Sequence, residues 1–296
     1  MPTQLRFDGR AAVVTGAGGG MGREFALLLG QRGAVVVVND LEGAQLVVDE
    51  IRAAGGHAVA AVGDISQSAT AKAAVECAVS AFGRIDIVVS NAALLVLKSF
   101  ADTTEEDLQR TLEVNVKASW FLAHAAWPHM SAERYGRILL VSSMNGVVFG
   151  TDQHCAYGAS KGALAGLARE LAFEGRPLGI QVNALLPGAV TTMLNTVSSY
   201  RSPDIDLSPA LVAPAACWLV HEQCDQTGTL VNASSARVSR VVSGLGEGFQ
   251  ATPASFTLEA VGEHRDQVSD AEALTRIDSL DDYNRFRTAR YRDAVT

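Results

Sequence analysis

The stretch Thr15-Gly16-Ala17-Gly18-Gly19-Gly20-Met21-Gly22 decides the fold of this chain. It follows a short apolar run, residues 10–15, and precedes a helix-like stretch, residues 23–31, and a second apolar run, residues 34–38. Short apolar runs that end at glycines are typical of buried parallel strands. A strand, a glycine loop, a helix and a second strand within about 30 residues form a βαβ unit, so the sequence predicts a parallel sheet.

The alternation continues along the chain. Strands are predicted at residues 58–62, 85–90, 137–142, 179–185 and 228–232, and helices at residues 68–81, 104–129 and 157–174. We therefore expect one α/β domain over residues 1–239, with a Rossmann-type, doubly wound, mainly parallel sheet and helices on both faces. We expect residues 240–296 to be a C-terminal extension, packed on the same domain or on a neighbouring subunit, with a surface helix near residues 278–293.

The glycine loop also indicates a ligand. Glycines let the backbone approach a pyrophosphate closely, and the following helix offers its N-terminal N–H groups. Asp40 lies 18 residues after Gly22, where a carboxylate can accept both ribose hydroxyls of NAD and repel the 2′-phosphate of NADP. Its neighbours Asn39, Leu41 and Glu42 include no arginine, which favours NAD. The alternative for Asp40 is a helix cap or a loop acid.

Tyr157 and Lys161 stand four residues apart, and Ser143 lies fourteen residues before the tyrosine. On a helix, residues i and i+4 share one face, so the ammonium group can lie beside the phenol. A neighbouring cation lowers the pKa of a tyrosine from its usual value near 10, which suits it to acid/base chemistry at neutral pH. By itself the pair also fits a solvated lysine packed along a tyrosine, so its weight depends on the glycine loop.

Together these motifs resemble the short-chain dehydrogenase/reductase family, in order and in spacing, over residues 5–235. The resemblance rests on the glycine loop, on Ser90-Asn91-Ala92-Ala93, and on Asn115, Ser143, Tyr157 and Lys161. It implies that Tyr157 is the catalytic acid/base and that Ser143 positions the substrate oxygen. It also implies that Lys161 lowers the pKa of the tyrosine and binds the nicotinamide ribose, and that Asn115 holds a water on the proton path.

The resemblance further implies a set of NAD contacts. Asp64 and Ile65 would face the adenine, and Pro187 and Gly188 with Thr192 would meet the nicotinamide end. The full set is Gly16, Gly18, Gly20, Met21, Gly22, Asp40, Asp64, Ile65, Asn91, Ala92, Tyr157, Lys161, Pro187, Gly188, Val190 and Thr192.

Three departures from the family pattern bear on the site. Ala93 stands where the family has a glycine, so the backbone there is expected to differ slightly. The gap from Ser143 to Tyr157 is one residue longer than usual, which makes Ser142 a competitor; we prefer Ser143 because residues 143–146 match the family's Ser-x-x-Gly turn. Ser234-Ser235 replaces an expected pair of glycines.

Several stretches are similar to the dehydrogenase region of the peroxisomal multifunctional enzymes: residues 37–41, 125–130 with 135–138, and 212–214 with 218–222. The short stretch between Gly188 and Pro209 and the tail beyond residue 235 are similar as well. That similarity implies NAD-linked oxidation of a 3-hydroxyacyl-CoA or a hydroxysteroid. The alternatives are a carbonyl reductase working in the opposite direction and a non-catalytic dinucleotide sensor on the same fold. Small residues on all sides of the helix at 157–174, together with the family resemblance, favour a homodimer or homotetramer.

Composition excludes other classes of protein. The net charge is −8 with no basic run, so no nucleic-acid partner is expected. The four cysteines include no Cys-x-x-Cys pair, so neither a disulfide framework nor a metal site is expected. No apolar run reaches the length of a membrane span, the first residues lack a signal peptide, and residues 293–296 are no peroxisomal address. We expect a freestanding cytoplasmic enzyme.

Two further features stay open in the sequence. Phe149, Met193, Val197 and Tyr200 would suit an apolar substrate pocket, but ordinary core or loop packing explains each of them equally well. His154 precedes Tyr157 closely enough to line the pocket, although an ordinary loop histidine is the simpler reading.

Overall fold

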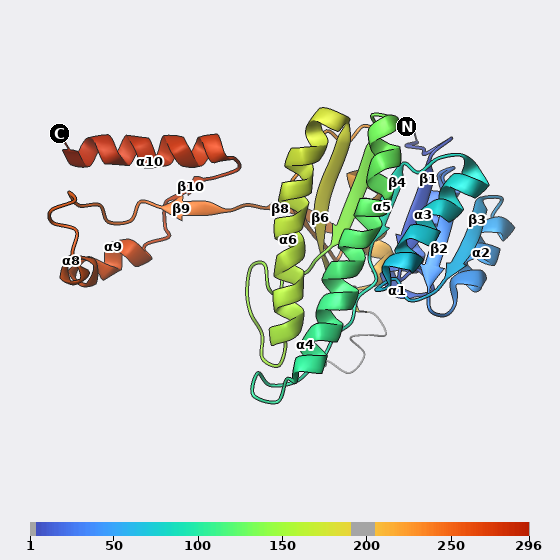
Figure 1. The fold of residues 1–296 in the computed structure, drawn as a ribbon, viewed down its shortest axis with the longest axis horizontal. Coiled ribbons are helices and arrows are strands. Elements are labelled where there is room, and N and C mark those ends of the chain that lie inside the picture. Colours follow the sequence, from blue (N-terminus) through green and yellow to red (C-terminus); the bar gives the residue numbers. More distant parts are fainter. Residues whose placement is uncertain (1–3, 191–204, 296) are drawn as a thin grey trace. The chain divides into compact units, whose positions relative to one another are not determined.

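The computed structural model describes residues 4–190 and 205–295, with side chains up to residue 288. One eight-stranded sheet has the order β3-β2-β1-β4-β5-β6-β7-β8 (Figure 1). All neighbours from β3 to β7 are parallel, and the strand order reverses between β1 and β4, as in a doubly wound sheet. The strands are β1 (Ala11–Thr15), β2 (Val35–Asp40), β3 (His57–Val62), β4 (Ile87–Ser90), β5 (Gly136–Val141), β6 (Ile180–Gly188), β7 (Leu230–Ser234) and β8 (Arg237–Val241).

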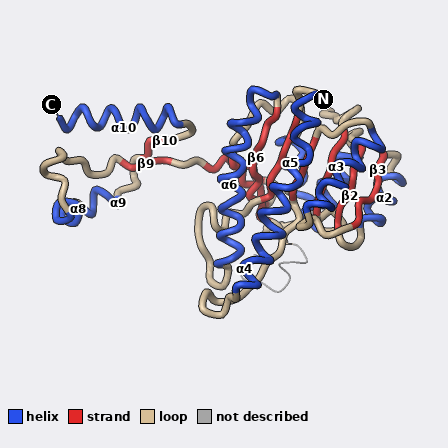
Figure 2. Tube along the Cα trace, viewed as in Figure 1, coloured by secondary structure: helices blue, strands red, loops and turns tan. Residues whose placement is uncertain are grey.

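Helices cover both faces of the sheet (Figures 1 and 2). On one face α1 contacts α2 and α7, and on the other α3 contacts α5 while α4 contacts α6. Every residue of β1, β4 and β5 is buried, because the two helical layers enclose the central strands. The helices are α1 (Gly20–Gln31), α2 (Ala44–Ala53), α3 (Ser68–Phe82), α4 (Glu105–Leu112), α5 (Ala118–Ala132), α6 (Cys155–Gly175) and α7 (Ala213–Leu219). The predicted fold class is confirmed.

The helical stretch predicted at residues 104–129 contains a break in its regular winding. It begins with a capping box between Thr104 and Asp107, and a π-helical turn, Glu113–Lys117, separates α4 from α5. Such turns are rare and frequently occur at functional sites, because the extra residue redirects the side chains around it. Asn115 lies in the middle of this turn.

The sequence predicts no strand after residue 232, and this is wrong, since β8 adds an edge to the sheet. Ser235 and Ala236 join β7 to β8 and have φ angles of 50° and 60°. A two-residue hairpin turn needs positive φ at both positions and usually has Asn-Gly there. Ser-Ala lacks that signal, which is why the sequence pattern hides the strand.

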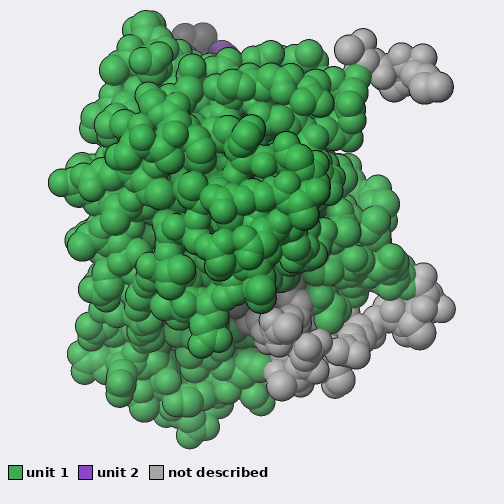
Figure 3. Space-filling view, turned by 90° about the vertical axis from the view of Figure 1, so that its right-hand side faces the viewer, with its two compact units in different colours: residues 1–240 green, residues 241–296 purple. Residues whose placement is uncertain are grey.

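The chain divides into two compact units, Met1–Arg240 and Val241–Thr296, coloured separately in Figure 3. The second unit pairs β9 (Gly244–Gly246) with β10 (Leu274–Arg276) in antiparallel fashion. It also contains the short helices α8 (Leu258–Glu263) and α9 (Arg265–Ser269) and the longer α10 (Leu280–Val295), close to the predicted surface helix. That this extension packs on the first unit or on a neighbouring subunit stays a prediction.

Within residues 4–190 and 205–295, the helices are too short or too polar to cross a membrane.

Candidate active site

A cleft of about 470 Å³ lies at the carboxyl ends of the parallel strands. Ligands of doubly wound sheets bind at this edge, near the point where strand order reverses, and the volume is typical of ligand pockets. The loops after β1 to β6 all contribute to its wall. The predicted site residues that line it are Gly16, Gly20, Met21, Asp40, Asp64, Ile65, Asn91, Ala92, Ser143, Tyr157, Lys161, Pro187 and Gly188.

The glycine loop is fastened to the loop after β4. The Thr15 hydroxyl accepts from the backbone N–H groups of Asn91 and Ala92, at 3.0 and 3.2 Å. The Asn91 amide donates in return to the carbonyls of Thr15 and Gly16, both at 3.0 Å. Gly16 has φ +61°, and a Cβ on it would lie 2.7 Å from Ala92 Cα, so only glycine allows this approach.

Two glycines of the predicted set lie outside the cleft wall and act by packing. A Cβ on Gly18 would lie 2.0 Å from the Glu42 carbonyl oxygen, and one on Gly22 would lie 2.2 Å from the Gly16 carbonyl oxygen. They let α1 begin directly after the loop, so that its first residues, Gly20 and Met21, line the cleft. A loop of this shape fits the pyrophosphate of a dinucleotide.

Asp40 ends β2 and lines the cleft. One of its carboxylate oxygens accepts from Gly18 N–H at 2.8 Å and the other from Leu41 N–H at 2.7 Å. Each oxygen keeps a further lone pair, so the carboxylate is held in place and can still accept ribose hydroxyls. The geometry fits the adenosine ribose of a dinucleotide.

The loop after β3 contains an ion pair that sequence reasoning missed. Arg110, on α4, donates to Asp64 at 2.8 Å and to the Ser66 hydroxyl at 2.8 Å, and Asp64 also accepts from Ser66 N–H at 3.0 Å. Although burial raises the pKa of Asp64, these hydrogen bonds outweigh it and hold the pKa below its usual range. Arg110 and Val114 both line the cleft, and their i, i+4 spacing was an available signal.

Helix α6 brings Tyr157 and Lys161 to the cleft together, as the spacing predicts. The Lys161 ammonium lies 5.7 Å from the centroid of the tyrosine ring and donates to the Val141 carbonyl at 2.7 Å. The lysine side chain is fully buried, and this burial lowers its pKa to about 7. A negative charge placed beside this lysine, such as a phenolate, would favour its protonated form and so raise its pKa.

The two adjacent serines have different roles in the structure. The buried Ser142 hydroxyl donates to the Lys161 carbonyl at 2.7 Å, so its proton is used inside the protein. Ser143 is half-buried in the cleft wall, and its oxygen accepts from Asn145 N–H at 3.2 Å, which leaves its proton for a ligand. This geometry favours Ser143 over Ser142 for holding a substrate oxygen.

The turn after Ser143 is pressed against α6. Gly146 has φ +84°, and a Cβ on it would lie 1.9 Å from the Gly158 carbonyl oxygen. A Cβ on Gly162 would in turn lie 2.8 Å from the Gly146 carbonyl oxygen. Glycines on both partners therefore fix the serine turn against the helix that carries Tyr157.

Asn115 lies behind the cleft and braces its wall. Its side chain accepts from Leu94 N–H at 2.7 Å and donates to the Leu94 carbonyl at 3.0 Å and to the Ser160 hydroxyl at 2.8 Å. Ser160 donates to the Tyr157 carbonyl at 2.7 Å. Both N–H groups of the amide and one lone pair of its oxygen are thus used by protein groups, and the Asn115 main-chain carbonyl accepts from the Ser119 hydroxyl at 3.0 Å. That Asn115 holds a water on the proton path stays a prediction.

Some predicted residues are not part of the observed wall. Val190 donates its N–H to the Leu207 carbonyl at 2.9 Å and does not line the cleft. Thr192 lies outside the described residues, as do Met193, Val197 and Tyr200. Phe149 is described, but it is exposed and lies outside the cleft wall. Ala93 does not have a positive φ, so it replaces a glycine without backbone strain.

His154 belongs to the cleft wall. It is buried, its ring packs edge-on to Tyr157 with centroids 6.1 Å apart, and its Nδ1 contacts the Asp152 carbonyl at 2.5 Å. Gln153, just before it, has φ +60°, and strain of this kind concentrates at functional sites. The only sequence signal was its place three residues before Tyr157.

Comparison with known proteins agrees with this geometry. The family model described as short chain dehydrogenase matches residues 10–201. The peroxisomal multifunctional enzyme type 2 of Drosophila melanogaster is 38% identical over 294 residues, covering 94% of this chain and 48% of that protein. The solved full-length structure of that enzyme superposes with a TM-score of 0.84 over 98% of this chain and 50% of that one, at 32% identity.

A solved 7α-hydroxysteroid dehydrogenase, complexed with NADH and 7-oxo glycochenodeoxycholic acid, is 34% identical. It superposes with a TM-score of 0.73 over 78% of this chain and 95% of that one. The chain spans about half the length of the multifunctional enzyme, so it corresponds to the dehydrogenase part only. On motifs, fold and sequence identity, the chain belongs to the short-chain dehydrogenase/reductase family, whose fold binds a nicotinamide dinucleotide.

Proposed function

We propose that the protein oxidises a secondary alcohol to a ketone with NAD, and that the alcohol is a 3-hydroxyacyl-CoA or a hydroxysteroid. The observation that carries the proposal is that Ser143, Tyr157, Lys161 and Asp40 all line one cleft at the carboxyl edge of the sheet. The first three supply proton-transfer chemistry at one end, and the fourth supplies a ribose acceptor at the other.

In this proposal the side chains orient the alcohol and move its proton. A nicotinamide dinucleotide held in the cleft would supply the hydride acceptor. The Ser143 hydroxyl, whose proton is not used by its contact with Asn145, donates to the substrate oxygen. Tyr157 takes the hydroxyl proton of the substrate as its general base. Lys161, protonated beside the phenolate, lowers the pKa of the tyrosine and so makes it an effective base at neutral pH.

The preference for NAD rests on Asp40. Its carboxylate, fixed by two backbone N–H groups, would repel a 2′-phosphate at short range. The related hydroxysteroid dehydrogenase, solved with NADH, supports the same choice. Two similarities support the substrate class: that to the dehydrogenase domains of peroxisomal multifunctional enzymes, which act on hydroxyacyl-CoAs, and that to the hydroxysteroid dehydrogenase solved with a 7-oxo steroid acid.

The experiment is a substrate panel. Purified protein is incubated with NAD or NADP and either 3-hydroxyacyl-CoAs of increasing chain length or hydroxysteroids, and formation of reduced cofactor is followed at 340 nm. We expect turnover with NAD and at least one of the two substrate classes. A strong preference for NADP would contradict the role of Asp40, and no turnover with either class would contradict the substrate assignment.

A second candidate is reduction of a ketone. The hydroxysteroid dehydrogenase complex contains a ketone together with reduced cofactor, which is the reactant pair of that direction. Measuring the reverse rate with NADH and 3-ketoacyl-CoAs or ketosteroids decides between the two. A reductive kcat/KM far above the oxidative one would favour the reductase.

We also propose that the protein is a homodimer or homotetramer that associates through α5 and α6. Trp120 on α5 and Phe173 on α6 are 53% and 80% exposed, so association through these helices would remove two large aromatic side chains from water. Sedimentation velocity should show a species of at least two chains, and Phe173→Glu should shift it towards the monomer. A wild-type monomer at micromolar concentration would contradict this.

A further inference from the structure

Arg110 connects two elements that meet at the adenine end of the cleft. It lies on α4, and its guanidinium group donates through one nitrogen to Asp64 and through another to Ser66, each at 2.8 Å. The second nitrogen also lies 3.6 Å from the Glu113 carboxylate. Three oxygen partners on two elements therefore hold the plane of the guanidinium in one orientation.

Stability does not explain this arrangement. The side chains of Arg110 and Asp64 are 40% and 32% exposed. Ion pairs exposed to this degree contribute about 0–1 kcal/mol to folding, because water screens them and their side chains lose entropy. Both side chains line the cleft instead, beside Ile65. What the pair does achieve is to fix the direction of the Asp64 carboxylate.

The position of the pair in the sheet identifies the part of the ligand that it meets. Asp64 follows β3, the edge strand next to β2, whose last residue is Asp40. Tyr157 and Ser143 line the part of the cleft formed after β5 and by α6. A dinucleotide with its adenosine ribose on Asp40 and its nicotinamide near Tyr157 therefore places its base at Asp64.

The family resemblance implies that Asp64 faces the adenine. We propose that Arg110 is a positioning residue for this contact, because it holds Asp64 as a fixed hydrogen-bond acceptor for the 6-amino group. The inference rests on the proposed function, namely that this cleft binds NAD. Each Asp64 oxygen has one protein partner and keeps a lone pair for an N–H donor. Adenine offers such a donor at position 6, whereas hypoxanthine offers a carbonyl oxygen that a fixed carboxylate repels.

The test compares two whole dinucleotides that differ in the group at position 6 and in the hydrogen on the adjacent N1: NAD and nicotinamide hypoxanthine dinucleotide. Dissociation constants are measured calorimetrically on the wild type, Arg110→Met and Arg110→Lys. We expect the wild type to bind NAD about tenfold more tightly, which corresponds to about 1.4 kcal/mol. Arg110→Met should lower this ratio to about two by weakening NAD, and Arg110→Lys should restore it in part. At saturating NAD, kcat should change less than about twofold while KM for NAD rises.

Lys117→Met is the matched control. Lys117 lies on the adjoining π-helical turn and, like Arg110, pairs with Glu113, at 3.8 Å, but it does not line the cleft. Its loss should leave the ratio of dissociation constants unchanged. Circular dichroism melting curves check that each variant is folded.

Three results would overturn the inference. They are equal affinity of the wild type for both dinucleotides, an equal loss of both affinities in Arg110→Met, and an unchanged ratio in that variant. Binding needs no alcohol, so these results are separate from a failed substrate panel. A wild type that binds neither dinucleotide would refute the cofactor assignment and this inference together.

Discussion

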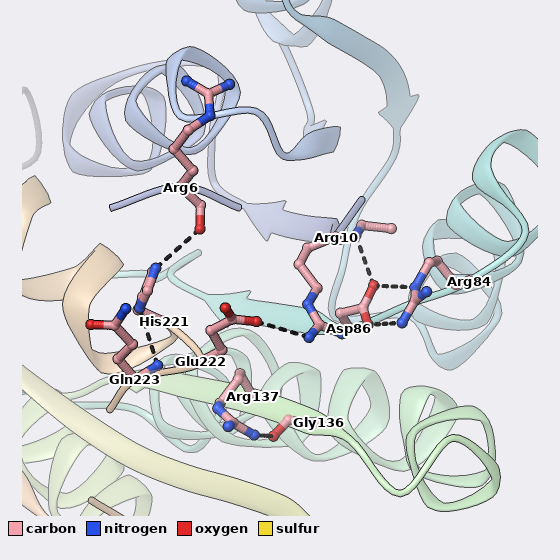
Figure 4. Close-up of polar contacts among 10 residues, drawn as sticks. Arg6, Arg10, Arg84, Asp86, Gly136, Arg137, His221, Glu222 and Gln223 are labelled. Carbon is pink, nitrogen blue, oxygen red and sulfur yellow. Dashed lines mark hydrogen bonds and ion pairs between the residues drawn. The ribbon is translucent and has the colours of Figure 1, made fainter. Parts of the chain in front are cut away.

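A buried charged side chain lies at each edge of the parallel sheet, and the two differ in whether they have partners of opposite charge. At the amino edge, Asp86 is 1% exposed and accepts from Arg10 and Arg84 and from Ala11 N–H (Figure 4). At the carboxyl edge, Lys161 is 2% exposed, and no carboxylate of the described residues lies within ion-pair distance of it. Its one described hydrogen bond goes to a neutral carbonyl, that of Val141.

This difference separates a structural charge from a functional one. A buried carboxylate with two cationic partners and a backbone donor is satisfied, and it holds the starts of β1 and β4 together. A buried ammonium without an anion is costly, and the cost appears as the low pKa of Lys161. Such a group is retained where a ligand or an ionised neighbour makes use of its charge.

The largest expected effect is a loss of turnover when the proton acceptor at the carboxyl edge is removed. Tyr157→Phe removes the proton acceptor and should lower kcat by about 10³-fold, because general base catalysis contributes that order. NAD affinity should stay within about twofold. Steady-state assays and calorimetric titration with NAD measure the two quantities. Wild-type turnover in this variant would refute the acid/base role.

Comparing substitutions of the two adjacent serines tests which of them contacts the substrate oxygen. Ser143→Ala should lower kcat/KM by about 10²-fold, the loss typical for one transition-state hydrogen-bond donor. Ser142→Ala removes only an internal bond to α6 and should cost less than about tenfold. The two variants are compared in the same steady-state assay. The reverse order of effects would make Ser142 the substrate contact.

Lys161→Met should lower activity and yet stabilise the ligand-free protein near neutral pH. The pKa of Lys161 is about 7 in the folded state and near 10.4 when unfolded. Between these values the unfolded chain binds more protons, so this group makes the free energy of unfolding rise with pH. Below pH 7 both states are protonated, the burial penalty is complete, and the contribution is flat.

Urea unfolding of wild type and Lys161→Met at pH 6 to 9.5 measures this directly. The wild type should gain stability relative to the variant as the pH rises above 7. A pH-independent difference would mean that Lys161 titrates normally in the folded protein.

At the amino edge, removing the buried charge of Asp86 should lower stability and leave activity nearly unchanged. Asp86→Asn leaves Arg10 and Arg84 without their shared carboxylate and should destabilise the protein by about 3 kcal/mol, as for a broken buried ion pair. Its kcat should change little. Glu222→Gln is the control, because Glu222 pairs with Arg10 but is exposed, and it should cost less than about 1 kcal/mol. The midpoints of urea unfolding measure the loss of stability. If Asp86→Asn lost much of its activity but none of its stability, Asp86 would not be a purely structural charge.

The smallest effect concerns the hairpin between β7 and β8. Ala236→Gly should stabilise the protein by about 0.5 to 1 kcal/mol, because glycine has no Cβ penalty at φ 60°. Ala73→Gly is the control on the exposed face of α3, where glycine should cost about 1 kcal/mol. Thermal melts compare the two. Destabilisation by Ala236→Gly would show that the turn is not strained.

Much of the site followed from the sequence because its parts are local. The glycine loop, Asp40 and the Tyr157/Lys161 spacing each combine a motif with the end of a strand or the face of a helix. Residues whose partners are distant in the chain were harder to assign. Arg110 meets Asp64 across 46 positions, and the choice between Ser142 and Ser143 depends on a bond that crosses 19 positions to α6.

The sequence by itself determined the doubly wound sheet, the dinucleotide loop and the family, since apolar periodicity and glycine spacing act over a few residues. Only the tertiary structure decided which of the two cleft serines keeps its hydroxyl proton for a ligand, that β8 extends the sheet, and that Asn115 braces Leu94. Only it showed that Lys161 is buried with no carboxylate partner among the described residues, whereas Asp86 is buried between two arginines. The physical reason is that burial and charge pairing are set by packing between segments far apart in the chain, which spacing along the sequence does not encode.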